Sequence, residues 1–111
     1  MSPITTHVLD VSIGKPAAGV AAQLELFDAG SWKVLGRGAT NVDGRIGDLL
    51  PDGHGLKAGM YRLTFQTSAY FKSTPAFYPE VAIVFEVRAV GEHYHVPLLL
   101  SPFGYSTYRG S

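Results

Sequence analysis

Histidines are the residues of this chain best suited to acid–base chemistry. The sequence contains four of them, His7, His54, His93 and His95. Imidazole is the only side chain whose ordinary pKa, about 6.5, lets it take up or release a proton near neutrality. His7, His93 and His95 fall within predicted strands, which are the rigid elements that a preorganised site needs. His54 falls in a glycine-rich loop, and we interpret it as a solvated or structural side chain.

Several other kinds of chemistry are excluded or disfavoured. The chain has no cysteine, and therefore no disulfide, thiolate metal site or cysteine nucleophile. His93 and His95, with His7 as a third ligand, form only a weak metal-binding pattern, because no carboxylate is evident near them. The sequence has no Gly-x-Ser-x-Gly, P-loop or dinucleotide-binding motif. We expect no metal at the site.

The C-terminal residues 105–111 (YSTYRGS) are a second concentration of polar groups. They include two tyrosines, an arginine and three aliphatic hydroxyl side chains, whereas chain ends are usually frayed and featureless. An apolar run over 96–100 and a turn over 102–104 precede this tail, which predicts a hairpin that returns the tail toward His95. The simpler structural alternative is an edge strand that ends in polar residues.

Composition and length limit the partners and the organisation. Nine basic and nine acidic residues cancel, so no long-range field attracts nucleic acid or an anionic membrane. The start of the sequence does not resemble a secretory signal, so we expect a cytoplasmic protein, with the mature form of a targeted protein as the alternative. One domain over residues 1–111 is expected. A domain of this size buries only roughly 60 to 65% of its unfolded surface, so oligomerisation would add burial.

Short segments rich in β-branched, aromatic and leucine residues recur between turn signals, and none keeps a 3.6-residue period over three turns. This pattern predicts an all-β antiparallel sandwich or barrel. One helical turn is expected over 68–74, capped by Ser68 and stopped by Pro75. The eight predicted strands cover residues 4–11, 20–27, 32–40, 45–50, 60–67, 81–90, 93–100 and 105–109.

Alternation within two of these strands predicts which side chains face outward, because residues two apart share a face. In the seventh strand the apolar set is assigned to the core, which turns His93 and His95 toward solvent or another subunit. In the first strand Thr5 and His7 share one face. The apolar set consists of Tyr94, Val96, Leu98 and Leu100.

Three blocks of the sequence resemble the 5-hydroxyisourate hydrolases, the purine-pathway relatives of the hormone carrier transthyretin. The first is residues 5–10 (TTHVLD) followed by 14–17 (GKPA), and the second is residues 40–45 (TNVDGR). The third is residues 93–111 (HYHVPLLLSPFGYSTYRGS). The similarity extends over essentially the whole chain.

This resemblance implies a transthyretin-like sandwich of two four-stranded sheets with one short helix. It also implies a homotetramer, a dimer of dimers, with active sites in grooves between the dimers. The implied reaction is hydrolysis of 5-hydroxyisourate to 2-oxo-4-hydroxy-4-carboxy-5-ureidoimidazoline in urate degradation. In it, water attacks a ring carbonyl with help from histidine, and no cofactor is needed.

The resemblance also assigns roles to individual residues. His7, Arg45, His95 and Ser111 match the family's catalytic positions, although the sequence leaves open which histidine is the base. His7, Arg45 and Tyr108 are expected to bind the substrate, with Arg45 presenting a planar fork of donors to oxygens or an anionic ring. Ser111 is expected to fix the water or a histidine tautomer through its hydroxyl or carboxylate.

Arg109 and Gly110 complete the tail motif as supporting residues. Arg109 is expected to hold the tail through ion pairs, and Gly110 to permit a close approach that a side chain would block. His93 is assigned to support or solvent.

Two alternatives remain open. One is a transthyretin-like carrier that binds an aromatic small molecule without turning it over, whose sequence would be expected to lack these histidines and this tail. The other is a β-sandwich interaction module with no chemistry. Removal of residues 108–111 would be harmless in such a module.

Overall fold

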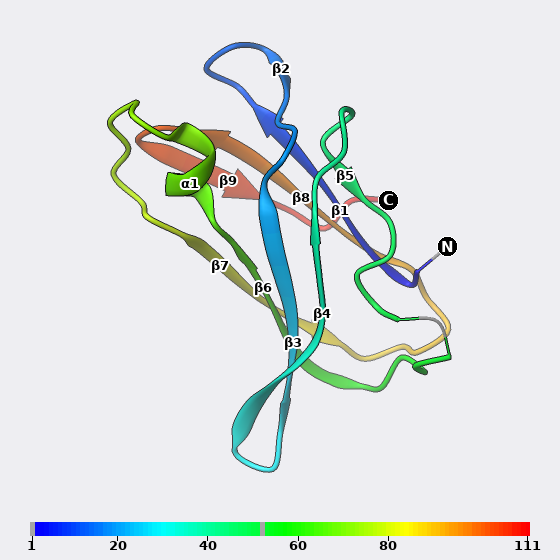
Figure 1. Cartoon of the computed structure of the whole chain (residues 1–111). Helices are drawn as coiled ribbons and strands as arrows, with labels where there is room; N and C mark the ends of the chain where they lie inside the picture. Colours follow the sequence, from blue (N-terminus) through cyan, green and yellow to red (C-terminus); the bar gives the residue numbers. More distant parts are fainter. Residues whose placement is uncertain (1, 52) are drawn as a thin grey trace.

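The computed structural model describes residues 2–51 and 53–111, which form two β-sheets packed face to face (Figure 1). The first sheet has the strand order β2-β1-β8-β9, and β5 also pairs with β1; the second has the order β4-β3-β6-β7. The expected transthyretin-like sandwich of two sheets with one short helix is confirmed, although the first sheet has five strands rather than four because β2 and β5 share one edge of β1. The bounds are β1 Ile4–Asp10, β2 Lys15–Pro16, β3 Ala21–Asp28, β4 Ser31–Ala39, β5 Arg45–Ile46, β6 Gly59–Phe65, α1 Thr67–Phe71, β7 Val81–Val87, β8 Tyr94–Ser101 and β9 Gly104–Thr107.

The pairing of β1 with β8 is parallel and differs from the antiparallel arrangement that the sequence predicts. Thr5 lies opposite His95, and His7 lies opposite Pro97. The difference arises because β7, which precedes β8, belongs to the other sheet, so β8 enters this sheet by a crossover rather than a hairpin. The other edge of β1 is shared by β2 and β5, which both pair with it in the antiparallel direction.

The core lies between the two sheets and takes alternate side chains from each strand. On β8 the predicted inward set is confirmed, with exposed fractions of 6% or less for Tyr94, Val96, Leu98 and Leu100. Tyr61, Leu63 and Phe65 of β6 are fully buried against them from the second sheet. Each such side chain stabilises the fold by about 1.5–3 kcal/mol relative to exposure. The opposite face of the first sheet is therefore free to carry polar groups.

The helix is shorter than predicted. It spans Thr67–Phe71. The next residue, Lys72, has a positive φ of 56°, which interrupts the helical backbone before Pro75. Ser68 does not cap it, because it lies inside the helix rather than before it. The strand predicted over 45–50 is reduced to β5, Arg45–Ile46, and the two-residue β2 was not predicted. The described residues contain no helix with the length and apolarity needed to cross a membrane.

Candidate active site

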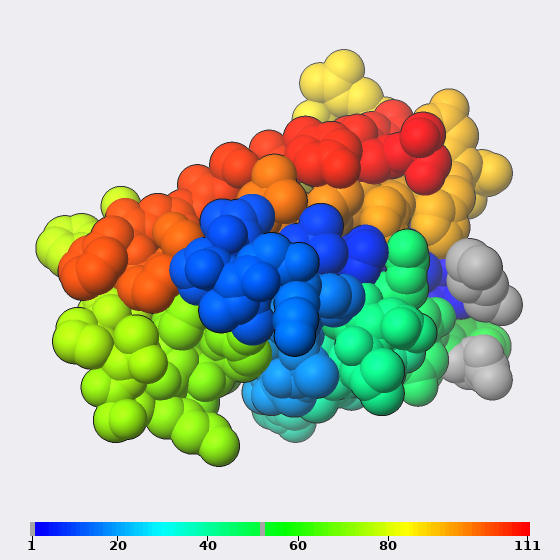
Figure 2. All heavy atoms as spheres, turned by 90° about the horizontal axis from the view of Figure 1, so that it is seen from above, coloured from blue at the N-terminus to red at the C-terminus, as the bar shows by residue number. Residues whose placement is uncertain are grey.

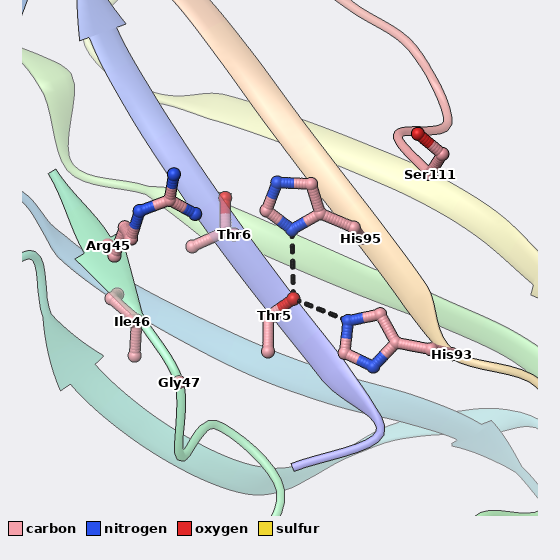
Figure 3. A pocket seen from close by; sticks show the side chains of 8 residues that line it. All are labelled: Thr5, Thr6, Arg45, Ile46, Gly47, His93, His95 and Ser111. Atoms are coloured by element: carbon pink, nitrogen blue, oxygen red, sulfur yellow. Dashed lines mark hydrogen bonds between the residues drawn. The ribbon is translucent and has the colours of Figure 1, made fainter. Parts of the chain in front are cut away.

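A pocket opens on the outer face of the first sheet, over β1, β5, the start of β8 and the end of the chain (Figure 3). Three predicted catalytic residues, Arg45, His95 and Ser111, line it together with Thr5 and His93. In Figure 3 the guanidinium of Arg45 extends over β1 toward His95, and Ser111 lies on the far side of that imidazole. Residues from three distant parts of the sequence thus meet around one imidazole.

Strand register explains how these side chains come together. His7 of β1 pairs with Arg45 of β5, and Thr5 of β1 pairs with His95 of β8. Because His7 and Thr5 are two residues apart, they share the outer face. His7 is half-buried and does not itself line the pocket, but it is close enough to influence the charge of His95.

A tight turn before β5 positions Arg45. The side-chain oxygen of Asn41 accepts hydrogen bonds from the backbone N–H groups of Asp43, at 2.9 Å, and Arg45, at 3.0 Å. Gly44 takes a left-handed conformation with φ of 75°, and a Cβ there would stand 2.3 Å from the carbonyl oxygen of Val8. The turn is therefore held against β1, and Arg45, exposed, begins the short strand with its side chain over the pocket.

The electrostatic surroundings of His95 favour its neutral form. Burial lowers the pKa of His95 below its usual value of 6.5, and the positive charge of Arg45 and the imidazoles of His7 and His93 lower it further. A neutral imidazole has one ring nitrogen free to accept a proton. His95 therefore has the protonation state that a general base requires at neutral pH.

The hydroxyl of Thr5 lies between two imidazoles, an arrangement that sequence reasoning missed. Its Oγ1 is 2.8 Å from Nδ1 of His95 and 2.9 Å from Nε2 of His93. The alternation of β1 places Thr5 on the same face as His7, and this shared face was the one feature of the sequence that could have indicated Thr5 as a site residue. Threonine is so common in strands that nothing marked its hydroxyl as functional.

The C-terminal tail returns along β8, as the hairpin interpretation predicts. Figure 2 shows it at the surface beside the residues of β8. The backbone N–H of Gly110 donates to the carbonyl of His95 at 2.9 Å. A Cβ at residue 110 would stand only 2.6 Å from Cδ2 of His95, so the tail can lie this close only because residue 110 is glycine. Ser111 is thereby brought to the pocket.

Arg109 fixes the tail to the segment that begins β8. Its guanidinium donates to the carboxylate of Glu92 at 2.9 Å and to the carbonyl of His93 at 3.2 Å, and it lies 4.4 Å from the ring centroid of Tyr94. Both members of the ion pair are more than half exposed, so the pair itself is weak. The three contacts together orient the tail more than they stabilise the fold.

Tyr108 does not line the pocket that holds Arg45. It lies in a second depression, between β7 and the tail, and is 59% exposed. His95 contributes to both depressions. Of the seven predicted site residues, the structure places Arg45, His95 and Ser111 in the pocket and His7 and Gly110 beside it. Tyr108 and Arg109 lie on the other side of His95.

Within residues 2–51 and 53–111, no group of three or more His, Cys, Asp or Glu side chains lies close enough together to hold a metal ion. The polar side chains that line the pocket carry imidazole, guanidinium and hydroxyl groups.

Comparison with known proteins identifies the family. The sequence model of the HIUase/Transthyretin family matches residues 4–110. The chain belongs to this family. It is 48% identical over 122 residues to the uric acid degradation bifunctional protein TTL of Arabidopsis thaliana, covering 98% of the chain but only 37% of that longer protein. It is 46% identical over 110 residues to the 5-hydroxyisourate hydrolase of Salmonella typhimurium, covering 97% of the chain and 80% of the relative.

Solved structures of the family share the fold. A sea bream transthyretin in complex with thyroxine superposes with a TM-score of 0.91 at 33% identity, covering 98% of this chain and 95% of that one. The 5-hydroxyisourate hydrolase of Klebsiella pneumoniae gives a TM-score of 0.84 at 37% identity, covering 97% and 98%. Since a transthyretin and a hydrolase share this architecture, the side chains on it must distinguish the two activities.

Proposed function

We propose that this chain is an enzyme of urate degradation that hydrolyses 5-hydroxyisourate to 2-oxo-4-hydroxy-4-carboxy-5-ureidoimidazoline. Relatives named 5-hydroxyisourate hydrolase, from Salmonella, Rhizobium meliloti and mouse, are 43–46% identical to it over nearly its whole length. The structural observation that carries the proposal is the meeting of Arg45, His95 and Ser111 around one pocket. A carrier would have no need of a neutral imidazole beside a guanidinium.

In the proposed reaction His95 is the leading candidate for the base. Its Nδ1 is hydrogen-bonded to the hydroxyl of Thr5, so Nε2 is the ring nitrogen available to a molecule in the pocket. Figure 3 shows this second nitrogen turned toward Arg45. As the oxygen of a water molecule bonds to a ring carbonyl carbon, Nε2 takes a proton from that water. The ring C–N bond then breaks, and the same proton passes to the leaving nitrogen. General acid–base help of this kind contributes about 10²- to 10⁴-fold.

The other predicted residues bind and position. Arg45 anchors substrate oxygens through its fork of donors and stabilises the negative charge that develops on the attacked carbonyl. His7, next to Arg45 across the strand pair, shares in orienting the substrate and the water. The hydroxyl of Ser111 holds the water or the imidazole in place. Tyr108 contributes to substrate binding from the far side of His95.

Assembly into a homotetramer, a dimer of dimers, is part of the proposal. β7 and β9 stand at the ends of their sheets, and their unpaired backbone groups favour addition of strands from another copy. The pocket is an open depression in one chain, so a second copy packed against this face would enclose the substrate. One domain over residues 1–111, working in the cytoplasm, is sufficient for this role, with no cofactor.

The deciding experiment uses fresh 5-hydroxyisourate, generated from urate by urate oxidase. Its absorbance is expected to decay faster with the protein than alone, and at the spontaneous rate with the His95→Ala variant. Binding of 5-hydroxyisourate or an aromatic ligand without faster decay would instead indicate the carrier function that transthyretin's similar fold suggests. Full activity after removal of residues 108–111 would contradict the assignment of the tail to the site.

A further inference from the structure

Two hydrogen bonds that share the hydroxyl of Thr5 connect the pocket to solvent. They run from Nδ1 of His95 to the hydroxyl of Thr5 and on to Nε2 of His93 (Figure 3). The two imidazole rings lie nearly parallel, at 27°, with centroids 6.4 Å apart. His95 is half-buried, whereas His93 is exposed. These hydrogen bonds therefore link an imidazole in the pocket to an imidazole exposed to water.

The single proton of the Thr5 hydroxyl allows only two arrangements of donors and acceptors in these hydrogen bonds. The hydroxyl of Thr5 has a single proton, so it can donate to only one of the two rings and must accept from the other. If it donates to His93, then His95 carries its proton on Nδ1, and Nε2 is a free base. If it donates to His95, then His95 carries its proton on Nε2 and is an acid, while His93 is protonated on Nε2. The two forms interconvert when both hydrogen-bond protons move one step toward His93, a proton is gained on Nε2 of His95 and a proton is lost from Nδ1 of His93.

The hydroxyl is well placed to control this choice. Thr5 is only 8% exposed, so water has little access to compete for its proton. The titratable or charged groups that lower the pKa of His95 are Arg45 on β5, His7 on β1 and His93, which lies just before β8. Arg45 is cationic and disfavours a second positive charge on His95. An additional proton on these hydrogen-bonded residues is therefore favoured away from Arg45, on the exposed imidazole of His93.

We propose that Thr5 is a positioning residue that sets the tautomer of His95, and that His93 is the outlet through which His95 exchanges protons with solvent. The inference deepens the proposed function and rests on it. When Nε2 of His95 accepts a proton from water, the proton on Nδ1 moves to Oγ1 of Thr5, and the hydroxyl proton moves to Nε2 of His93. The Nδ1 proton of His93 passes to solvent or buffer. After Nε2 gives its proton to the leaving nitrogen, Nδ1 of His93 takes up a proton from solvent, and the reverse shifts restore the free base.

Thr5 is tested with Thr5→Val, which keeps the shape of the side chain and removes the hydroxyl, and with Thr5→Ser, which restores it. We expect Thr5→Val to lower kcat by about 10- to 100-fold with little change in KM, because the lost tautomer control is part of the general-base contribution. Thr5→Ser should recover most of kcat. Thr67→Val is the matched control, since Thr67 is also buried and its hydroxyl donates to Tyr78 away from the pocket.

His93 is tested by chemical rescue. His93→Ala should lower kcat, and added imidazole should restore it in a concentration-dependent way, whereas wild-type kcat should not respond. An unaffected kcat in both Thr5→Val and His93→Ala would overturn the inference. So would a loss in Thr5→Val that Thr5→Ser does not recover, because that result would indicate packing rather than the hydroxyl.

A readout independent of turnover separates this inference from the proposed function. Nitrogen-15 NMR of the resting protein reports which ring nitrogen of His95 carries the proton. The signals are expected to shift in Thr5→Val and to return in Thr5→Ser. Shifted signals in a protein that does not accelerate 5-hydroxyisourate decay would refute the hydrolase function but retain the role of Thr5. Unchanged signals in an active enzyme would refute the role of Thr5 alone.

Discussion

Replacing Gly110 by alanine tests whether the tail must lie against His95 for the site to work. The added Cβ would stand 2.6 Å from Cδ2 of His95 and 3.2 Å from Cγ of Pro97, and both atoms belong to closed rings. His95 is held by Thr5, so its ring has little freedom to turn away. Relief therefore comes mainly from lifting the tail. Overpacking of this kind costs about 1–3 kcal/mol.

That cost is comparable to what holds the tail in place. The hydrogen bond from Gly110 to the His95 carbonyl contributes about 0.5–1.5 kcal/mol. At about 1.4 kcal/mol for each factor of ten, the penalty shifts the balance between docked and lifted tail by about 5- to 150-fold. Ser111 would leave the pocket in most molecules. We expect kcat/KM to fall by about tenfold or more, while the melting temperature changes little because residue 110 is outside the core.

The assay compares 5-hydroxyisourate decay, thermal melting and amide exchange at residue 110 in the two proteins. Gly104→Ala is the control, since that glycine also lies in the C-terminal hairpin and its added Cβ would meet only Ser101 Oγ, at an ordinary 3.8 Å. It should behave as wild type. A Gly110→Ala variant with kcat/KM within twofold of wild type, and with a protected amide at residue 110, would refute the reasoning.

The remaining predictions concern charge. Because burial and neighbouring positive charge lower the pKa of His95, kcat/KM should persist below pH 6.5 and fall only as the pH drops through the lowered value. A fall centred above 6.5 would argue against His95 as the base. Arg45→Lys should raise KM for 5-hydroxyisourate more than it lowers kcat, since a lysine lacks the planar fork of donors. Burial opposes the charge of Asp10, but hydrogen bonds from Ser12 and Tyr70 outweigh it and lower the pKa of Asp10. Its stabilising effect should be present above the unfolded-state pKa of about 3.9 and lost as the pH falls through the folded value, and Asp10→Asn should lower the free energy of unfolding near neutral pH by about 1–3 kcal/mol in urea titrations.

The outward face of the first sheet was predictable because one rule governs it. The period of two over residues 93–96 separates Tyr94 and Val96 from His93 and His95, and burial in the structure follows that division. Turn chemistry was equally local: the turn predicted over 102–104 joins β8 to β9 in the structure. Such features depend on residues within a few positions of each other, so the sequence displays them directly.

Features that depend on distant parts of the chain were not predictable in the same way. Alternation does not reveal whether two strands run parallel, so the pairing of Thr5 with His95 could not be derived from it. A reversed direction or a one-residue slip would bring a different β1 side chain beside His95. The predicted bounds of the helix were wrong for a related reason, because the positive φ of Lys72 that ends the helix reflects tertiary context rather than propensity.

The division of labour between the two faces of the first sheet explains how one architecture serves two activities. Inward side chains such as Leu98 and Val8 are completely buried and stabilise the sandwich, so changes there act on folding. The outward side chains Thr5, His95 and Arg45 form a pocket and contribute little to the core, so they can change without loss of the fold. A thyroxine-bound transthyretin and a hydrolase can therefore share this backbone and differ in chemistry. On this argument the identity of the outward residues, and not the closeness of the superposition, assigns the chain to the hydrolases.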